Sequence, residues 1–461
     1  MDIDKLYGIF LSCGCVTTDS RKISGGELFF ALKGENFDGN EYALKALDDG
    51  AAYAVVDESS PVAVAAADDP RLIPVPDTLH ALWALARHHR DKFSIPVLGL
   101  TGTNGKTTTK ELINAVLSTK FRTHATCGNL NNNIGVPLTV LGMSADTEIA
   151  IIEMGASHPG DIKELVDIAA PDFGLITNVG KGHLLGFGSF EGVKATKGEM
   201  YDFIAGNAGG AGTVFVNHDN PLLLEMAAAR GFGAAPDGYS FDREAFLGRD
   251  RQKCNSGKLL AVSYGLHFSG AKVLDSDSAH PYLRLRLSDG KLVDTNLVGS
   301  YNADNVLAAL CIGRFFGVPE TDAVAAVASY VPSNNRSQMQ RTGRNILIVD
   351  AYNANPSSMK AALDNFAGFD ATKKIVLLGN MLELGDESVA EHAKVLQAVA
   401  DYGLEGYFVG EEFRKAGAGN WFGTSDELAA YIEAHEPEFT SAAILIKGSR
   451  GTRMEKVIPA L

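Results

Sequence analysis

The sequence predicts an α/β protein built from three domains. A single hydrophobic core rarely grows beyond about 250–300 residues, and this chain has 461. Short apolar runs alternate with stretches of helical periodicity through the middle and again through the last third of the chain. Such alternation indicates mostly parallel sheets covered by helices. From these shifts in pattern we expect domains at residues 1–94, 95–319 and 320–461.

Residues 1–94 combine short apolar runs with turn-rich segments, as in a small α/β domain. The runs ELFFAL (27–32) and AAYAVV (51–56) are typical of buried strands. The segment DTLHALWALARHHR (77–90) repeats apolar residues at three- and four-residue spacing, which predicts a helix with one buried face. The residues SIP (94–96) that follow are expected to form a linker.

The middle region alternates apolar strands with helices. The expected strands are VLGLT (97–101), EIAIIEMGA (148–156), PDFGLITNVG (171–180) and GTVFVNHD (212–219), with a helix from about residue 161. Residues 280–299 alternate with period two around the turn Ser288-Asp289-Gly290, which predicts an antiparallel hairpin. The segment 302–317 is a predicted helix that Gly317 and Pro319 terminate.

The last third has a second α/β pattern, which predicts a Rossmann-like domain. Its expected buried strands are NILIVDAY (345–352), KKIVLLGNM (373–381), GYFVG (406–410) and AAILIKGS (442–449), with helices between them.

Composition excludes several classes of protein. Lys and Arg total 41 against 56 Asp and Glu, a net charge of −15, so the chain lacks the basic field that attracts nucleic acids or anionic membranes. No apolar run approaches the about 18–20 residues of a membrane span, and the N-terminus lacks a signal peptide's basic region. We expect no nucleic acid partner, no membrane insertion and a cytoplasmic location. The cysteines, too few for a disulfide scaffold, are Cys13, Cys15, Cys127, Cys254 and Cys311.

A glycine-rich loop follows the predicted strand at 97–101 and opens a helix. The strict phosphate-loop pattern G-x-x-x-x-G-K-S/T requires glycine at position 100, where Leu100 stands, so this loop is a variant. Its glycines let backbone N–H groups approach phosphate, and the helix N-terminus favours anions. Lys106 is expected to meet the terminal phosphates and Thr107 a Mg²⁺ ion. The expected ATP-binding residues of the loop are Gly102, Thr103, Asn104, Gly105, Lys106, Thr107 and Thr108.

Two further side chains follow predicted parallel strands. Glu153 ends one strand and His183 follows the next. Because ligands of open parallel sheets bind at the carboxyl ends of the strands, both are candidates for a site beside the phosphate loop. Glu153 is expected to reach the metal, and His183 to contact metal or phosphate. Lys197, at the start of a predicted helix, looks like an ordinary solvated lysine on residue pattern alone.

Five segments, in order, resemble the Mur ligases, the ATP-dependent amide-bond-forming enzymes of peptidoglycan precursor synthesis. They are TGTNGKTTTK, EMGASHPGDI, NVGKGHL, KATKGEM and GSYNADNVLAA. The resemblance covers nearly the whole chain. A second set resembles the branch that joins D-Ala-D-Ala to UDP-MurNAc-tripeptide: TDSR, GNLNNNIGVPL, DAYNANPSSM, LGNMLELG and IKGSR. The resemblance implies a uridine-nucleotide-binding first domain, a central ATPase and a third domain that closes on the nucleotide.

The resemblance also implies a mechanism and its metal ligands. ATP phosphorylates a carboxylate to give an acyl phosphate and ADP, and the amine of the second substrate then displaces phosphate. The resemblance implies ATP as co-substrate and two Mg²⁺ ions, held by Thr107, Glu153, His183 and a carbamylated Lys197. Lys106, Glu153, His183 and Lys197 would form the catalytic set. We expect a monomer.

The resemblance assigns further residues to the substrates, each with an ordinary structural alternative. Asn302 and Asn305 match the asparagines expected to contact adenine, although either is also a helix N-cap candidate. Arg336 and Asp350 match nucleotide-binding residues of the third domain, where a surface arginine and a turn aspartate are the alternatives. Asn353 and Asn355 would face the dipeptide, or form an Asn-rich turn before Pro356. Ser20, Arg21, Asn131 and Asn132 would face the uridine-nucleotide substrate, or make ordinary loop hydrogen bonds. Lys447 and Arg450 are candidates to meet anionic substrate groups.

The sequence departs from the family at three places. It has Asn40 after Asp38-Gly39 where the family often has histidine, Asn380 where aspartate is usual, and Gly182 where alanine precedes the histidine. These departures affect the expected N-terminal pocket more than the phosphate loop.

Three rival functions are consistent with part of the pattern. The branch that adds a diamino acid carries an Asp-Asn-Pro-Arg segment, which this sequence lacks. Folylpolyglutamate synthase shares the ATPase core but not the UDP-binding first domain, so residues 1–94 argue against it. A regulator that binds nucleotide and muropeptide without chemistry would not need Glu153, His183 and Lys197 together.

Overall fold

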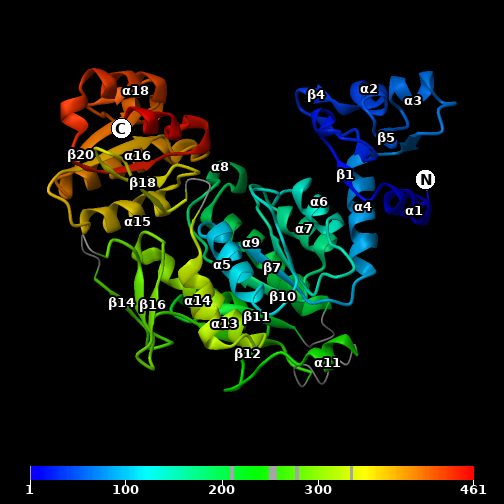
Figure 1. Ribbon diagram of the computed structural model, residues 1–461, viewed down its shortest axis with the longest axis horizontal. Coiled ribbons are helices and arrows are strands. Elements are labelled where there is room, and N and C mark those ends of the chain that lie inside the picture. Colours follow the sequence, from blue (N-terminus) through cyan, green and yellow to red (C-terminus); the bar gives the residue numbers. More distant parts are fainter. Residues whose placement is uncertain (1, 208–211, 249–256, 276–279, 333–335) are drawn as a thin grey trace.

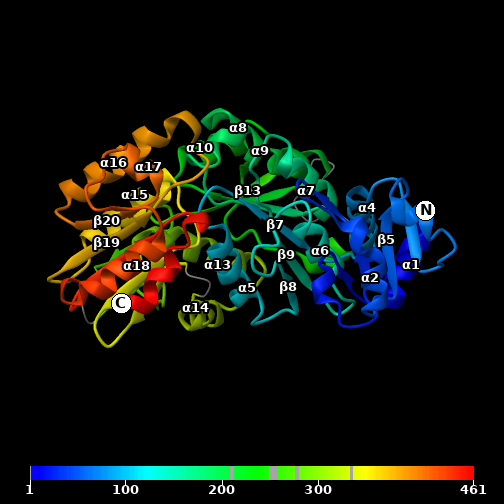
Figure 2. The same cartoon turned by 90° about the horizontal axis from the view of Figure 1, so that it is seen from above.

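The computed structural model describes residues 2–207, 212–248, 257–275, 280–332 and 336–461. Three α/β units follow one another along the chain, and the first and third lie at opposite ends of the molecule with the second between them (Figures 1 and 2). Four cysteines, Cys13, Cys15, Cys127 and Cys311, carry free thiols, whereas Cys254 lies outside the described residues. The described part of the chain contains no helix long and apolar enough to cross a membrane.

The first unit is a parallel sheet with the strand order β1-β2-β5-β6. Its long helix α4 begins at Thr78, where the Asp77 carboxylate caps the first turn by accepting a hydrogen bond from the His80 N–H at 2.7 Å. The elements are α1 Ile3–Cys13, β1 Val16–Thr17, η1 Ser20–Lys22, β2 Leu28–Phe30, β3 Lys33–Gly34, β4 Phe37–Asp38, η2 Gly39–Tyr42, α2 Ala43–Asp48, β5 Tyr53–Asp57, α3 Pro61–Ala65, β6 Leu72–Val75 and α4 Thr78–Asp91.

Helix α4 joins the first unit to the second. Its buried Leu82 and Leu85 belong to a hydrophobic cluster that continues to Val136 and Ile152 in the middle unit. The Arg90 guanidinium donates to the backbone oxygens of residues 169 and 170 and to the Asp172 carboxylate. The predicted amphipathic helix therefore buries its apolar face between two units.

The middle unit contains an entirely parallel sheet with the order β12-β13-β11-β10-β7-β9-β8. Helices α5 and α13 cover one face, while α7 and α9 pack together at the other (Figure 2). The elements are β7 Val97–Thr101, α5 Lys106–Leu117, β8 Thr123–Ala125, α6 Gly135–Leu141, β9 Ile149–Glu153, α7 Asp161–Ala169, β10 Phe173–Ile176, α8 Leu184–Phe187, α9 Phe190–Asn207, β11 Thr213–Asn217, α10 Pro221–Ala228, β12 Gly233–Ala234, α11 Arg243–Leu247 and β13 Leu260–Tyr264.

A separate antiparallel sheet, β14-β15-β16, follows the parallel sheet in sequence. It consists of β14 Lys272–Leu274, β15 Arg284–Arg286 and β16 Leu292–Asp294, and it confirms the hairpin predicted around residues 288–290. Next come η3 Ser300–Asn302, α13 Ala303–Phe315 and α14 Glu320–Ser329. Helix α14 contributes Ala323 and Val327 to the same hydrophobic cluster as α5 and α13. Gly317 and Pro319 thus end a helix but not a domain, and the packing favours a later boundary than the expected one at residue 319.

The third unit is a mixed sheet with the order β17-β18-β22-β19-β20-β21, in which only β17 is antiparallel to its neighbour. Hydrophobic clusters lie on both faces of this sheet, as the buried strand pattern predicts. The elements are β17 Gln338–Arg341, β18 Ile346–Asp350, α15 Pro356–Ala367, β19 Lys374–Gly379, η4 Gly385–Glu387, α16 Ser388–Asp401, β20 Glu405–Val409, α17 Glu411–Lys415, β21 Trp421–Phe422, α18 Ser425–Ala434, η5 Glu436–Phe439, β22 Ala443–Lys447, η6 Arg450–Thr452 and η7 Met454–Ala460.

Candidate active site

The phosphate loop connects β7 to α5 at the carboxyl edge of the middle sheet. Gly102 has φ +147° and Gly105 has φ +77°, conformations that favour glycine. A Cβ atom at Gly102 would lie 2.0 Å from the Thr177 Oγ1, and one at Gly105 would lie 2.8 Å from the Asn305 Oδ1. Both glycines are therefore needed for the loop to pass between its neighbours, as the sequence pattern predicts.

Lys106 is the first residue of α5, and its ammonium group turns back over the loop. The Nζ atom donates to the carbonyl oxygens of Gly102 at 2.8 Å and Thr103 at 3.2 Å. Burial lowers the pKa of Lys106 below its usual value, and the nearby charge of Glu153 partly offsets this effect. A positive charge enclosed beside helix α5's N-terminus is well placed to attract a phosphate group.

Asn178, which sequence reasoning did not single out, braces the loop from the end of β10. Its Oδ1 accepts from the Asn104 N–H at 2.9 Å, and its Nδ2 donates to the Asn104 backbone oxygen at 3.0 Å. The Thr177 hydroxyl donates to the same oxygen at 2.7 Å. Both residues lie in the expected strand 171–180, and Asn178 opens the family-like segment NVGKGHL, but the residue pattern does not show these hydrogen bonds.

Glu153 ends β9 beside the loop, where the sequence placed it. Its side chain is buried, and one oxygen, Oε1, accepts from the Thr107 hydroxyl at 3.0 Å and the Asn131 Nδ2 at 2.8 Å. The other oxygen, Oε2, is buried and has no hydrogen-bond partner among the described residues. A buried carboxylate oxygen without a partner is costly. A hydroxyl and a carboxylate are ligands that suit Mg²⁺, which otherwise keeps water and phosphate ligands, so these residues fit one such ion.

His183 and Lys197 belong to the part of the chain that follows β10, before α8 and within α9. His183 precedes α8 with φ +52°, and its Nδ1 lies against the Glu383 carboxylate of the third unit. Lys197 lies within α9, not at its start, and is 2% exposed. Its Nζ is 5.6 Å from the centre of the Phe187 ring. Burial, with the charge of Lys106, lowers the pKa of Lys197 far below its usual value.

The pattern-based expectation of a solvated Lys197 is therefore wrong. Burial shifts the lysine toward its uncharged amine, the form that reacts with carbon dioxide. Across the described ranges, no group of three or more His, Cys, Asp or Glu side chains is arranged to hold a metal ion. A second cation site with His183 would therefore need a ligand of another kind.

Asn302 and Asn305 lie together next to the phosphate loop. Asn305 donates from Nδ2 to the Asn302 Oδ1 at 2.9 Å and accepts at Oδ1 from the Thr109 hydroxyl at 2.9 Å. Asn302 donates to the Val298 backbone oxygen at 2.8 Å. Asn302 stands at the N-cap position of α13, but its side chain makes no capping hydrogen bond. The N-cap alternative therefore does not explain this side chain.

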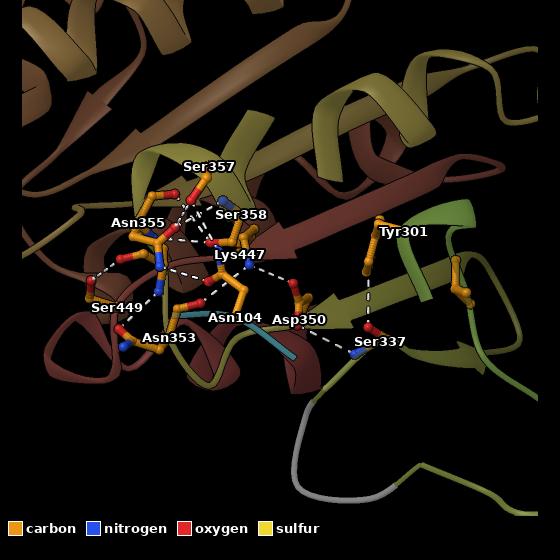
Figure 3. Close-up of polar contacts among 12 residues, drawn as sticks. Asn104, Tyr301, Ser337, Asp350, Asn353, Asn355, Ser357, Ser358, Lys447 and Ser449 are labelled. Carbon is orange, nitrogen blue, oxygen red and sulfur yellow. Dashed lines mark hydrogen bonds and ion pairs between the residues drawn. The ribbon is translucent and has the colours of Figure 1, made fainter. Parts of the chain in front are cut away.

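The third unit brings charged residues to the opposite wall. The Arg336 guanidinium stacks on the Tyr352 ring, with its Cζ 3.6 Å from the ring centre, and the buried Lys447 forms an ion pair with Asp350 (Figure 3). Lys447 also donates to the Asn353 backbone oxygen at 3.2 Å. Arg336 is thus held against an aromatic ring, unlike a free surface arginine.

The second and third units meet at the phosphate loop itself. Asn355 caps α15 with its Oδ1, as the turn alternative suggests, and its Nδ2 donates to the Asn104 Oδ1 at 2.7 Å (Figure 3). The Asn104 Nδ2 in turn donates to the Ser357 hydroxyl at 3.0 Å. Ser357 was not foreseen, because its partner lies 253 residues away in sequence.

Most of the expected residues share one cavity of about 800 Å³. Its lining includes Thr103, Asn104, Gly105, Lys106, Thr108, Asn131, Asn132, Glu153, His183, Asn302, Asn305, Arg336, Asp350, Asn353, Asn355 and Lys447. The Thr107 hydroxyl lies behind this lining and donates a hydrogen bond to Glu153, which lines the cavity.

Ser20, Arg21, Gly102, Thr107, Lys197 and Arg450 are absent from this lining. Arg21 pairs with Asp19 on the surface of the first unit, which matches the loop alternative. Arg450 contacts Tyr352 instead, with its Nη1 3.4 Å from the hydroxyl. Asn40, where the family often has histidine, is buried and hydrogen-bonded to Asp38 and Asp57.

This geometry defines a phosphate-loop nucleotide-binding protein whose third α/β unit contacts the nucleotide loop. Residues 13–90 match the description "Mur ligase family, catalytic domain", residues 100–313 "Mur ligase middle domain" and residues 335–450 "Mur ligase, glutamate ligase domain". The chain belongs to the Mur ligase family.

Relatives cover nearly its full length. The chain is 33% identical to the UDP-N-acetylmuramoyl-tripeptide–D-alanyl-D-alanine ligase of Bacillus subtilis, over 97% of this chain and 92% of that protein. It is 33% identical to the Escherichia coli protein of the same name, over 99% of this chain and 95% of the other. The crystal structure of MurF from Acinetobacter baumannii, 26% identical, superposes with a TM-score of 0.79 and covers 99% of this chain and 97% of that one.

Proposed function

We propose that the chain joins D-Ala-D-Ala to UDP-MurNAc-tripeptide at the expense of ATP, through an acyl phosphate, with ADP and phosphate released. The observation that carries this proposal is that Lys106 of the phosphate loop, Glu153 and Arg336 line the same cavity between the middle and third units. Two relatives at 33% identity over nearly the whole chain bear the name of this activity.

The reaction requires two anions, the tripeptide carboxylate and the γ-phosphate, to approach each other. The loop N–H groups and the Lys106 ammonium, beside helix α5's N-terminus, would bind the phosphates, and Arg336 would stabilise charge that develops on the transferred group. Bound Mg²⁺ would supply further charge neutralisation. Thr107 and Glu153 would hold one ion, and His183 with carbamylated Lys197 a second. Thr103, Asn104, Gly105 and Thr108 would complete the phosphate loop, and Asn302 and Asn305 would contact adenine.

The remaining assignments place the two other substrates on either side of the nucleotide. Asn131 and Asn132 line the cavity from the middle unit, and with Ser20 and Arg21 they would face the uridine nucleotide. Asn353 and Asn355 would face the dipeptide from the third unit, with Asp350 beside the nucleotide. The expected domains at residues 1–94, 95–319 and 320–461 remain our proposal, except that helix α14 belongs with the second domain, against which it packs. We also propose a monomer that works in the cytoplasm.

A phosphate-release assay with omitted components tests the function. Purified protein receives ATP, Mg²⁺, UDP-MurNAc-tripeptide and D-Ala-D-Ala, and each is left out in turn. We expect phosphate release only with the complete mixture, together with a product heavier than the tripeptide nucleotide by the mass of the dipeptide less water. Phosphate release that does not depend on the dipeptide would contradict the proposal. Activity with UDP-MurNAc-dipeptide and a diamino acid would favour the neighbouring branch instead.

A further inference from the structure

The segment that contains His183 is clamped by the third unit. The Lys181 ammonium pairs with Glu387 at 2.7 Å and with Glu391 at 3.2 Å, both from the third unit. The Leu185 N–H donates to the Glu383 backbone oxygen at 3.1 Å. The Glu383 carboxylate lies against the Nδ1 of His183. Four contacts therefore join residues 181–185 to residues 383–391.

Glu383 and His183 share an uncommon backbone conformation that sets them apart from Lys181, Leu185, Glu387 and Glu391. Glu383 has φ +64°, a left-handed conformation that glycine adopts far more readily than a long side chain. Residues in such conformations cluster at functional sites, where the surrounding structure holds them. Here both partners are left-handed, since His183 has φ +52°.

The contact involves the Nδ1 atom of the His183 ring. Nδ1 is buried and makes no hydrogen bond of regular geometry in the described part of the chain, and the Glu383 carboxylate is the acidic group within ion-pair range of it. A histidine that binds a metal commonly donates its other ring N–H to a carboxylate, which sets the tautomer and the ring orientation. With Nδ1 directed to Glu383, Nε2 is the nitrogen left for a ligand in the cavity that His183 lines with Glu153 and Lys106.

We propose that Glu383 is a positioning residue that orients the His183 imidazole toward a divalent cation from across the domain boundary. This inference rests on the proposed function, which places a cation at His183. Because the carboxylate belongs to the third unit and the histidine to the second, the cation site reaches its full affinity only when the two units are in contact. Docking of the third unit and metal binding are then linked, so each favours the other.

A Mn²⁺ titration of the full chain tests the proposal. Bound Mn²⁺ is counted by electron paramagnetic resonance with a non-hydrolysable ATP analogue and UDP-MurNAc-tripeptide present. We expect two ions per wild-type chain. Glu383→Ala should weaken one of them by about 10- to 100-fold, the usual cost of losing the partner of a metal-bound histidine. Glu383→Gln retains an acceptor for the Nδ1 proton, so its Mn²⁺ affinity should lie between those of wild type and Glu383→Ala.

Two further variants separate positioning from docking. Glu387→Ala removes an ion pair of the same clamp without touching His183, and it should leave both Mn²⁺ affinities within about twofold of wild type, the range expected for an exposed ion pair. In a His183→Ala background, Glu383→Ala should cause no additional loss, because it acts through the ring. Equal losses in Glu383→Ala and Glu387→Ala, additive losses with His183→Ala, or a single Mn²⁺ in wild type would overturn the proposal.

The readout also distinguishes this inference from the proposed function. Mn²⁺ binding is measured without D-Ala-D-Ala and without turnover. A protein that shows the expected Mn²⁺ pattern but forms no amide bond would contradict the proposed function and support the role of Glu383. Thermal unfolding of each variant by circular dichroism confirms that the chain remains folded.

Discussion

At the scale of single residues, the lysine of the phosphate loop is the most direct test of nucleotide binding. Lys106→Ala removes the ammonium group that lies over Gly102 and Thr103. We expect phosphate release to fall by at least about 10²–10³-fold, the typical cost of losing one group that stabilises transition-state charge. The fold should persist, because the side chain lies over a loop and not within a core cluster. The assay is substrate-dependent phosphate release, with the exposed Lys163→Ala as control; unchanged turnover in Lys106→Ala would contradict the ATP assignment.

Lys197 gives a second residue-scale prediction. If a carbamate on Lys197 supplies oxygen ligands to a cation, Lys197→Ala should be inactive, and a short carboxylate such as formate or acetate should partly restore phosphate release. Lys194→Ala is the matched control, because Lys194 lies on the same helix but pairs with Glu225 at the surface. Wild-type activity in Lys197→Ala, or no response to formate and acetate, would argue against the carbamate.

Site residues could be predicted from the sequence where a local pattern marks them. They could not be predicted where their role depends on a contact partner far away in the sequence. Gly102, Lys106 and Glu153 follow from a strand, a glycine-rich turn and a helix start, and the structure places them together. Ser357 and Glu383 lie in the family-like segments DAYNANPSSM and LGNMLELG, but nothing local shows their contacts with Asn104 and His183 in another unit. The same limit explains Lys197, whose burial depends on tertiary packing that its helix sequence does not disclose.

At the scale of elements, buried strands and capped helices are the features that the sequence predicts best. The strands expected around residues 97–101, 149–153, 346–350 and 443–447 are all present, because fully buried strands require continuous apolar runs. The packing of α14 was not foreseen. Its Ala323 and Val327 share a hydrophobic cluster with α5 and α13, and such tertiary contacts have no sequence signature.

The start of β2 provides a prediction of pH dependence. The Glu27 carboxylate accepts hydrogen bonds from the Ser24 hydroxyl and from the backbone N–H groups of Ser24 and Gly25, and these bonds lower its pKa from 4.5 to about 2. Since the folded pKa lies below the unfolded one, this stabilisation is complete above about pH 4.5 and is lost as the pH falls toward 2.

We therefore expect Glu27→Gln to reduce the free energy of unfolding at pH 7 by about 1 kcal/mol, and the difference from wild type to shrink as the pH falls below 4.5. Urea unfolding at pH 7, 4 and 3, followed by circular dichroism, measures this difference in the free energy of unfolding. The exposed Glu35→Gln serves as control. A difference that stays constant over this pH range would show that the charge of Glu27 is not the cause.

At the scale of the whole molecule, the net charge of −15 does not attract ligands that are themselves highly anionic. Positive groups gather where the second and third units meet: Lys106, Arg336 and Lys447 all line the central cavity. The acidic remainder of the surface does not attract polyanions in general. Binding of two nucleotides by such a chain therefore depends on a local cluster of charge that only the contact between the units completes.

That contact predicts a change of shape on ligand binding. Polar contacts join the second and third units, Asn104 with Asn355 and Ser357, and Lys181 with Glu387 and Glu391. Val298 of the second unit also packs in a hydrophobic cluster of the third. The exposed pair of Lys181 with Glu387 contributes only about 0–1 kcal/mol, and the polar contacts are few, so without ligand we expect the units to separate. If ATP and the sugar nucleotide bind as proposed, they would bridge the cavity and hold it closed, which would also exclude water from a hydrolysable acyl phosphate.

Small-angle X-ray scattering measures this closure as a smaller radius of gyration when a non-hydrolysable ATP analogue and UDP-MurNAc-tripeptide are added together. Lys181→Ala loses two ion pairs of the contact and should need about two- to fivefold more ligand to reach the same compact state, in line with the modest energy of exposed pairs. Lys163→Ala, exposed on α7, should close like wild type. Identical scattering curves with and without ligands would mean that the units are already held together, and the water-exclusion argument would then apply to a permanently formed cavity.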